Sequence, residues 1–481
     1  MIIMRTRSKK GEQLGNYYLA IDIGASSGRH ILGSIEDGKI VLEEIYRFEN
    51  GMVEKNGHLC WNHERTFKEI LAGIKKCKEI GKIPTSMSID TWGVDFALLD
   101  ENDKLLGDTV GYRDSRTRGM DEEVYKIIPE KELYARTGIQ YAIFNTIYQL
   151  MAVKKEHPEQ MEQAKAMLTT PDYFQFLLTG VKMQEYTMAT TGQLINPKTF
   201  DWDYELIDML GYNKEIFQKV QMPGTSVGHF TKEIQDQVGF DCEVVLCGSH
   251  DTASAVLAVP ANDDDFLYIS SGTWSLMGIE KKEADCSAAS QKANLTNEGG
   301  YDKRYRYLKN IMGLWMIQSV RHELDDKYSF AELCDMASQC DDFPSRVAAN
   351  DDCFLAPKSM IAEIQRYCRD TNQPVPETPG ELSVVIYKSL AQCYAQTAKE
   401  IEEITGRTYS RIHVIGGGSN AVYLNELTAK ETGKEVHCGP GEATAIGNIV
   451  AQMIKAGDFA SVEEARTCIY NSFGVKKYVS K

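Results

Sequence analysis

The chain has 481 residues, of which 43% are hydrophobic and 25% are charged, and it carries a formal net charge of -16. This length exceeds the size at which one hydrophobic core stops growing, so we expect two domains, and the composition is typical of a globular protein. The acidic balance argues against a nucleic-acid partner, and no apolar run approaches the roughly 18 residues that span a bilayer, so we expect a cytoplasmic protein that acts on small molecules without membrane partners.

The first part of the chain is rich in strand signals. Residues 1–15 are basic and polar and predict a flexible extension. Period-two alternation then predicts an antiparallel meander of three strands, followed by a helix and a short buried strand. These five elements are expected at residues 17–23, 29–36, 39–48, 67–80 and 86–89.

A mostly helical section is expected over residues 120–210, where Pro158, Pro171 and Pro197 interrupt the pattern. A strand over 243–247 leads out of this section. Strands that alternate with helices in this way predict a mixed α/β fold.

The second part opens with a new set of strands at Phe266, after an acidic and turn-like segment. We therefore expect two domains, formed by residues 16–257 and 258–481. The second domain is expected to continue with a proline-rich loop, a long helix, a strand and a further helix, at residues 372–379, 381–405, 411–415 and 421–432.

Two strand ends resemble each other. The first strand of the chain ends in Gly24–Gly28, and the strand that begins at Phe266 ends in Ser270–Thr273. Glycines let a backbone approach a ligand, and the N–H and hydroxyl donors of such turns suit phosphate oxygens, although Gly and Ser also make ordinary tight bends. With a third turn at Gly416–Asn420, the pattern favours a nucleotide held between two domains. Asp22, at the end of the first strand, either caps the turn or holds magnesium through water.

Two other segments resemble nucleotide motifs incompletely. Gly33–Ile40 has Ile40 where a P-loop needs Ser or Thr, so a hairpin explains it better. Gly416–Ala421 fits the pattern GxGxxA, with Glu435 about 19 residues further on. Too few residues follow for a complete dinucleotide domain, and NAD(P) binding stays a minor alternative.

Asp251 has two interpretations. It follows the strand over 243–247 and could cap a helix over 253–259, or it could act as a general base that accepts a proton from a hydroxyl group. Trp92 and Trp274 lie beside polar turns and either face a sugar ring or fill a core corner, which is the preferred interpretation for Trp274.

Longer runs of the sequence resemble the FGGY carbohydrate kinases, which belong to the actin-like ATPase superfamily. The similarity extends from about Tyr18 to Ile449 and is greatest to the members that act on L-rhamnulose. The runs that carry it are Asp22–Arg29, Ile89–Phe96, Tyr112–Arg116, Pro171–Phe174, Ser249–Ala255, Ser270–Gly278, Asn297–Gly300 and Lys309–Trp315.

This resemblance implies an α/β fold of two actin-like (ribonuclease H-like) ATPase domains, with mixed sheets flanked by helices and an active site in the interdomain cleft. It implies transfer of phosphate from ATP to the 1-hydroxyl of L-rhamnulose, with Mg2+ as cofactor and Asp251 as the base. The first domain would bind sugar and phosphate, and the second the nucleotide. The ketose positions are Gly93, His250, Asp251, Thr252 and Asn310. The ATP positions are Ala25, Ser26, Ser27, Gly28, Arg29, Thr273, Gln318 and Gly417, and the metal positions are Asp22 and Asp251.

Several alternatives stay open. The acceptor could be another ketose such as L-fuculose or D-xylulose, or the chain could be a non-catalytic actin-like nucleotide switch. An NAD(P) oxidoreductase is a third possibility. The oligomeric state could be a monomer or a homodimer. The twelve cysteines lack CxxC pairs and predict reduced thiols, with any disulfide or redox role left open.

Overall fold

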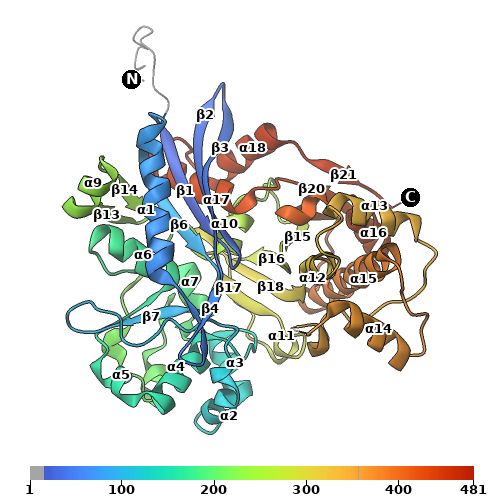
Figure 1. The fold of residues 1–481 in the computed structure, drawn as a ribbon, viewed down its shortest axis with the longest axis horizontal. Helices are drawn as coiled ribbons and strands as arrows, with labels where there is room; N and C mark the ends of the chain where they lie inside the picture. Colours follow the sequence, from blue (N-terminus) through green and yellow to red (C-terminus); the bar gives the residue numbers. More distant parts are fainter. Residues whose placement is uncertain (1–15, 356, 481) are drawn as a thin grey trace.

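The structure is a computed structural model that describes residues 16–355 and 357–480. The extension predicted at residues 1–15 lies outside the described residues. Most of the longer strands belong to two large mixed sheets flanked by helices (Figure 1). Within the described ranges, no helix is both long enough and apolar enough to cross a membrane.

The first large sheet is built from the first half of the chain. Its strands, in spatial order, are β13 (Ser226–His229), β14 (Glu243–Val245), β6 (Pro84–Thr91), β1 (Tyr17–Ile23), β2 (Ser27–Glu36) and β3 (Lys39–Glu49). β1 pairs parallel with β6 and antiparallel with β2, which in turn pairs antiparallel with β3. The predicted meander is therefore confirmed.

The second large sheet is built from the second half. Its strands, in spatial order, are β17 (Thr296–Gly299), β18 (Tyr305–Met312), β16 (Trp274–Lys281), β15 (Phe266–Ser271), β19 (Arg411–Ile415), β20 (Glu435–Cys438) and β21 (Lys476–Tyr478). β15 pairs antiparallel with β16 and parallel with β19. The central strand β15 thus has the same kinds of neighbours as β1.

The helices and short strands complete the fold. Helices before residue 250 are α1 (His63–Glu79), α2 (Met120–Tyr125), α3 (Glu130–Thr137), α4 (Thr146–Glu156), α5 (Pro158–Gln163), α6 (Thr170–Thr179), α7 (Tyr186–Thr191), α8 (Tyr204–Met209) and α9 (Lys232–Val238). Those after it are α10 (Asp251–Leu257), α11 (Ala288–Lys292), α12 (Trp315–Glu323), α13 (Phe330–Gln339), α14 (Met360–Asp370), α15 (Pro379–Thr405), α16 (Val422–Thr432), α17 (Ala443–Ala456) and α18 (Val462–Phe473). The shorter strands are β4 (Met52–Lys55), β5 (His58–Trp61), β7 (Phe96–Leu99), β8 (Ala166–Thr169), β9 (Gln184–Glu185), β10 (Ile195–Asn196), β11 (Asp201–Trp202) and β12 (Val220–Gln221).

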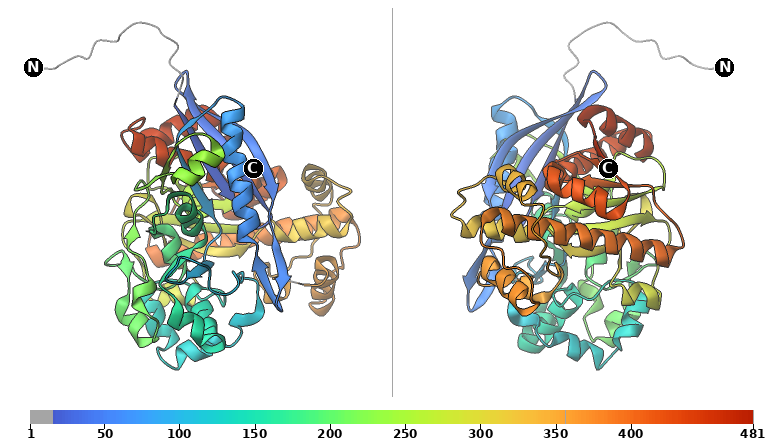
Figure 2. Two further views of the ribbon diagram at one scale, coloured as in Figure 1. Left: turned by 60° about the vertical axis from the view of Figure 1, so that its left-hand side comes forward. Right: turned by 90° about the vertical axis from the view of Figure 1, so that its right-hand side faces the viewer.

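The two central strands each bury both of their faces. Successive side chains of a strand point to opposite faces, so Leu19 and Ile21 of β1 join a core with α1 and α6, while the even-numbered side chains join α10 and α17. On β15, Phe266 and Tyr268 contact the same core as α10 and α17, and the odd-numbered side chains pack with α12 and α15. Helices α10 and α17 therefore lie between the two sheets. The long α15 lies on the outer side of the second half, as the right-hand view of Figure 2 shows.

The two central helices approach each other closely. Gly447 of α17 faces the backbone of α10, where a Cβ atom would overlap the carbonyl oxygen of Ser254. Glycine is the residue that allows such an approach. Helix α17 also bonds to the first sheet, because Asn448 donates to Asp90 Oδ2 at 2.6 Å and Gln452 donates to the Leu19 carbonyl oxygen at 3.0 Å. Helix α17, near the end of the chain, is thus hydrogen-bonded to β1, the first strand of the chain.

Some predicted elements differ from the structure. The section over 120–210 is mostly helical, as predicted, but it also contains the short strands β8 to β11, which were not predicted. Pro158 begins α5 and Pro171 is the second residue of α6, so neither ends a helix, because a missing N–H costs no hydrogen bond in the first turn. Helix α10 begins at Asp251 rather than at residue 253. The division of the chain at residue 257 stays a prediction.

Candidate active site

The first predicted phosphate turn is shorter than the sequence indicated. Only Gly24, Ala25 and Ser26 lie between β1 and β2, and Ser27 already belongs to β2. The conformation is held internally, because Gly24 N–H donates to the carbonyl oxygen of Ser27 at 2.9 Å. Asn50 adds two hydrogen bonds, from its backbone N–H to Ser26 (3.0 Å) and from its side chain to Gly24 (2.8 Å). Sequence reasoning missed Asn50, since nothing local connects it to the turn.

Two residues of the predicted phosphate set have structural partners. A Cβ atom on Gly28 would overlap the ring of Phe48, so packing alone requires glycine there. Arg29 lies opposite Asp22 on the neighbouring strand and forms an ion pair with it at 2.6 Å. The guanidinium also pairs with Glu442, which directly precedes α17. Arg29 therefore connects the first sheet to the second half of the chain.

The second and third turns lie against each other. Thr273, at the tip of the β15–β16 hairpin, donates from Oγ1 to Gln318 Oε1 at 3.4 Å. A Cβ atom on Gly418 would overlap Ser271 Oγ, whereas a Cβ atom on Gly417 would meet open space. The structure thus brings Thr273 and Gln318 together and places the exposed Gly417 on the turn beside them. The polar side chains of Thr273 and Gln318 and the exposed backbone of Gly417 thus lie together, an arrangement that suits binding of a nucleotide.

The predicted sugar residues gather where β6 ends and α10 begins. Thr91, the last residue of β6, donates its N–H to the Ser249 carbonyl oxygen at 2.9 Å and forms an isolated bridge with His250. Gly93 follows two residues later, beside the side chain of Thr191. The adjacent run of His250, Asp251 and Thr252 therefore lies beside Gly93, while Asn310 is half-buried on β18 of the second sheet.

Asp251 is the first residue of α10, and His250 occupies the capping position before it. The Asp251 side chain is 35% exposed, and its Oδ1 accepts a hydrogen bond from Thr252 Oγ1 at 3.0 Å. The same oxygen also accepts a hydrogen bond from the backbone N–H of Thr252, as a helix cap would, while the carboxylate keeps access to solvent, so both interpretations stay predictions. A partly exposed carboxylate can accept a proton from a bound hydroxyl group.

Three carboxyl groups lie near one another at this place. Asp22 and Asp90 are paired neighbours on β1 and β6, and both are buried. Burial raises the pKa of the Asp22 carboxyl, which Arg29 opposes; burial and the Asp22 charge raise the pKa of Asp90 well above its usual value. The charge of Asp251 adds to both increases. The Asp90 Oδ1 atom has no hydrogen-bond partner in the described residues. The sequence indicated Asp22 and Asp251 but not Asp90.

The wall behind Gly93 is a buried aromatic pair. Trp61 and Trp92 stack with ring centroids 4.0 Å apart, and both indole N–H groups donate to Asp95 Oδ2, at 2.6 and 2.8 Å. Trp92 is 8% exposed, so its core interpretation is confirmed. Trp274 is partly buried and packs against two hydrophobic clusters.

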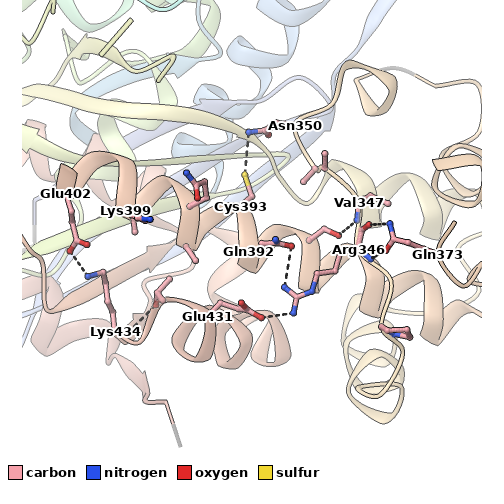
Figure 3. Close-up of a pocket in the computed structure, with 18 residues that line it drawn as sticks. Arg346, Val347, Asn350, Gln373, Gln392, Cys393, Lys399, Glu402, Glu431 and Lys434 are labelled. Carbon is pink, nitrogen blue, oxygen red and sulfur yellow. Dashed lines mark hydrogen bonds and ion pairs between the residues drawn. The ribbon is translucent and has the colours of Figure 1, made fainter. Parts of the chain in front are cut away.

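A cavity of about 870 Å³ lies elsewhere, along α15 (Figure 3). Arg346 reaches Gln392 and Glu431 across it, and Lys434 pairs with Glu402 at 2.6 Å. None of the sugar, ATP or metal positions lines this cavity. Its charged side chains are already paired, so we do not place chemistry there.

Comparisons with known proteins show which family the chain resembles. Residues 17–258 match the N-terminal domain, and residues 267–456 the C-terminal domain, of the FGGY family of carbohydrate kinases. A rhamnulokinase of Halalkalibacterium halodurans is 52% identical over 465 residues, which cover 97% of this chain and 99% of that protein. A rhamnulokinase of Oceanobacillus iheyensis is 48% identical and covers 96% of this chain and 97% of its own.

Solved structures show the same fold at much lower sequence identity. A ligand-bound xylulose kinase from Lactobacillus acidophilus has a TM-score of 0.79 at 17% identity, covering 97% of this chain and 94% of the other. Plasmodium falciparum glycerol kinase with ADP has a TM-score of 0.77 at 14% identity, with the same coverage. The predicted fold class, two actin-like α/β domains with mixed sheets flanked by helices, is therefore confirmed. Because the chain matches both domains of the family and is about half identical to two relatives over nearly the whole length, it belongs to the FGGY family of carbohydrate kinases.

Proposed function

We propose that the protein transfers the γ-phosphoryl group of ATP to the 1-hydroxyl of L-rhamnulose, giving L-rhamnulose 1-phosphate and ADP in L-rhamnose catabolism. The observation that carries this proposal is the identity of 52% and 48% to two rhamnulokinases over nearly their whole length. The position of Asp251, partly exposed and close to Asp22 and Asp90, supports it.

Asp251 acts as the general base in this proposal. A sugar hydroxyl is a poor nucleophile at neutral pH, so a carboxylate has to orient it and accept its proton as the new P–O bond forms. The hydrogen bond from Thr252 Oγ1 to Asp251 Oδ1 fixes one oxygen and leaves the other free for the substrate. Gly93, His250, Thr252 and Asn310 would contact the remaining ketose hydroxyls.

ATP would lie between the three glycine-rich turns. The N–H and hydroxyl donors of Ala25, Ser26 and Ser27 would face the terminal phosphates, and Thr273 would do so from the opposite sheet. Gly28 and Arg29 lie on β2 and would support this turn. Gln318 and Gly417 would contact the rest of the nucleotide. Arg29 contributes mainly through its ion pairs with Asp22 and Glu442, which hold the first turn against α17.

Magnesium fits this site as an ion held through phosphate oxygens and water. In the described part of the chain, no group of three or more His, Cys, Asp or Glu side chains could hold a metal directly. Magnesium commonly keeps several waters and binds through one or two carboxylates and substrate phosphates, a role that Asp22 and Asp251 could serve. The unpartnered Asp90 Oδ1 beside them is a further acceptor. When bound, the ion would offset the phosphate charge.

The remaining expectations are part of the same proposal. Residues 16–257 would form the sugar- and phosphate-binding domain and residues 258–481 the nucleotide-binding domain, with catalysis in the cleft between them. The partners would be ATP and a small ketose, without nucleic acid or membrane. The protein would act in the cytoplasm as a monomer or homodimer.

The test is a coupled ADP-release assay with L-rhamnulose, L-fuculose and D-xylulose at matched concentrations. We expect the largest kcat/KM with L-rhamnulose. A larger value with another ketose would reassign the acceptor. ATP turnover that no ketose stimulates would instead favour the nucleotide switch.

A further inference from the structure

A buried ion pair lies directly behind the proposed sugar-binding residues. Glu298 on β17 and Arg306 on β18 are opposite each other in the antiparallel register. Their side chains are 7% and 1% exposed, and Arg306 Nη2 lies 3.1 Å from Glu298 Oε2. Arg306 Nε also donates to the Gly299 carbonyl oxygen at 2.8 Å. Both charged groups are thus fixed in the interior of the second half.

Such a pair calls for a physical explanation. Removing two charges from water costs several kcal/mol per ion, and packed hydrophobic residues of similar volume often stabilise a protein equally well. Stability alone therefore gives little reason for a charged pair here. Arg306 Nη1 also lacks a hydrogen-bond partner in the described residues. The pair is better explained by a role in fixing the side chain that it contacts.

The third member of the cluster is His250, which comes from the first half of the chain. Its Nδ1 lies 3.0 Å from Arg306 Nη2 and 3.3 Å from Glu298 Oε2. Its Nε2 lies 3.5 Å from Asp251 Oδ1, and its backbone N–H donates to Thr187 Oγ1 at 3.2 Å. The ring is 12% exposed and is held between the ion pair and the proposed base.

The partners of His250 fix the orientation of its ring. Nδ1 faces both members of the ion pair, a guanidinium that donates at 3.0 Å and a carboxylate that accepts at 3.3 Å, so this nitrogen has a partner whether or not it carries a hydrogen. With Nδ1 held there, Nε2 is the nitrogen nearer to Asp251. Partners behind a histidine commonly fix its ring orientation in this way.

We propose that Arg306 and Glu298 are positioning residues, which hold the imidazole of His250 in one orientation so that its Nε2 faces the ketose and the Asp251 carboxylate. This inference rests on the proposed function, because it assumes that His250 contacts the sugar. In this inference, β17 and β18 of the second half help to orient the His250 ring, which the first half contributes. Neither residue would touch ATP, so the sugar side of the reaction alone depends on them.

The test uses the full chain and separates positioning from folding. Arg306→Met alone leaves the Glu298 charge buried without its partner and can prevent folding. The main variant is therefore Arg306→Met with Glu298→Gln, which removes both charges. Arg304→Met is the matched control, because the only ion pair of Arg304 among the described residues is with Glu463 at 3.5 Å, near the surface. Thermal unfolding identifies the variants that fold.

We expect the double variant to lose roughly 10- to 100-fold in kcat/KM for L-rhamnulose, the size that follows removal of a partner behind a functional histidine, while the KM for ATP stays within about twofold. Arg304→Met should match the wild type. In a His250→Ala background the double variant should cause no further loss, since the ring on which it acts is gone. If the double variant does not fold, Arg306→Lys should still raise the KM for L-rhamnulose, because an ammonium group cannot bridge the same acceptors.

Three results would overturn the inference while the proposed function survives. These are an unchanged kcat/KM for L-rhamnulose in a folded double variant or in Arg306→Lys, an equal rise in the KM for ATP, or a full additional loss in the His250→Ala background. A wild-type protein whose ADP release no ketose stimulates would overturn the proposed function and this inference with it.

Discussion

The contact between α10 and α17 makes a sharp prediction for Gly447→Ala. A Cβ atom there would overlap the Ser254 carbonyl oxygen and lie 2.5 Å from its carbonyl carbon, against the 3.4 Å at which ordinary contact begins. The obstacle is backbone, and the carbonyl oxygen lies closer than the carbon, so one helix has to move by more than about 0.9 Å. Overpacking of this kind costs about 1–3 kcal/mol of unfolding free energy.

The same displacement should also affect catalysis. Helix α10 begins with Asp251, so a shift at Ser254 changes the place of the proposed base. A misplacement of about 1 Å can lower a rate by about 100-fold. We therefore expect Gly447→Ala to lose both stability, measured by urea unfolding, and kcat, measured by ADP release in conditions where the variant is still folded.

Gly51→Ala is the control, because a Cβ atom there meets nothing within 4 Å. It should leave stability and kcat unchanged. If Gly447→Ala unfolds at the wild-type urea concentration and keeps the wild-type kcat, then the helices tolerate a wider separation and the reasoning fails. A loss of stability with an unchanged kcat would show instead that the position of α10 does not control the base.

Three further predictions concern single positions. Asp251→Asn should lower kcat by about 100- to 10,000-fold while ATP binding, followed by calorimetry, stays near the wild-type value; a nearly normal kcat would remove Asp251 as base. Gly28→Ala should lose about 1–3 kcal/mol of unfolding free energy because its methyl group meets the Phe48 ring, and in a Phe48→Leu background the same substitution should cost much less; an equal cost there would mean that the Phe48 ring is not what excludes a side chain at residue 28. Burial raises the pKa of Asp172 to about 8 and that of Glu185 to about 7. Between about pH 4 and 8 the folded protein therefore holds more protons than the unfolded chain. Its unfolding free energy consequently falls as the pH rises through this window. In Asp172→Asn this slope, measured by urea unfolding at about pH 5, 6 and 7, should be shallower by up to about 1.4 kcal/mol per pH unit, and an unchanged slope would refute the assignment.

Local sequence patterns predicted the strands and turns well. The alternation that begins at Tyr17 and the one that begins at Phe266 each depend on neighbouring residues, and both strands start where predicted. The strand over 411–415 was predicted with its observed bounds for the same reason. The short strands between residues 166 and 202 were missed, because two to four residues carry too little alternation to be distinguished from a helical segment.

The contacts that hold the candidate site could not be predicted in the same way. Gly28 was interpreted as a phosphate-facing glycine, although Phe48 explains it, because a glycine signal does not name the neighbour that excludes a side chain. Glu298 lay within a run that resembles the family, yet nothing in the sequence connected it to His250. Asn50 and Asp90 were overlooked for the same reason. Partners distant in sequence become visible only when the strands are paired.

The site depends on alignment of the two halves more than on either half alone. The first turn is connected to α17 through Arg29 and Glu442, and the residue before the proposed base is connected to β17 and β18 through Arg306. Each connection joins a residue of the first half to a residue of the second half, so neither half alone fixes the residue that it contributes. If the connection through Arg306 were lost, Thr273 and Gln318 could still bind nucleotide, since they belong to the same half, but the acceptor would no longer be held facing the phosphate. Substitutions of Arg306 and Glu298 should therefore lower kcat and sugar affinity before they weaken the binding of ATP, whereas loss of the connection through Arg29 would also disturb the phosphate turn.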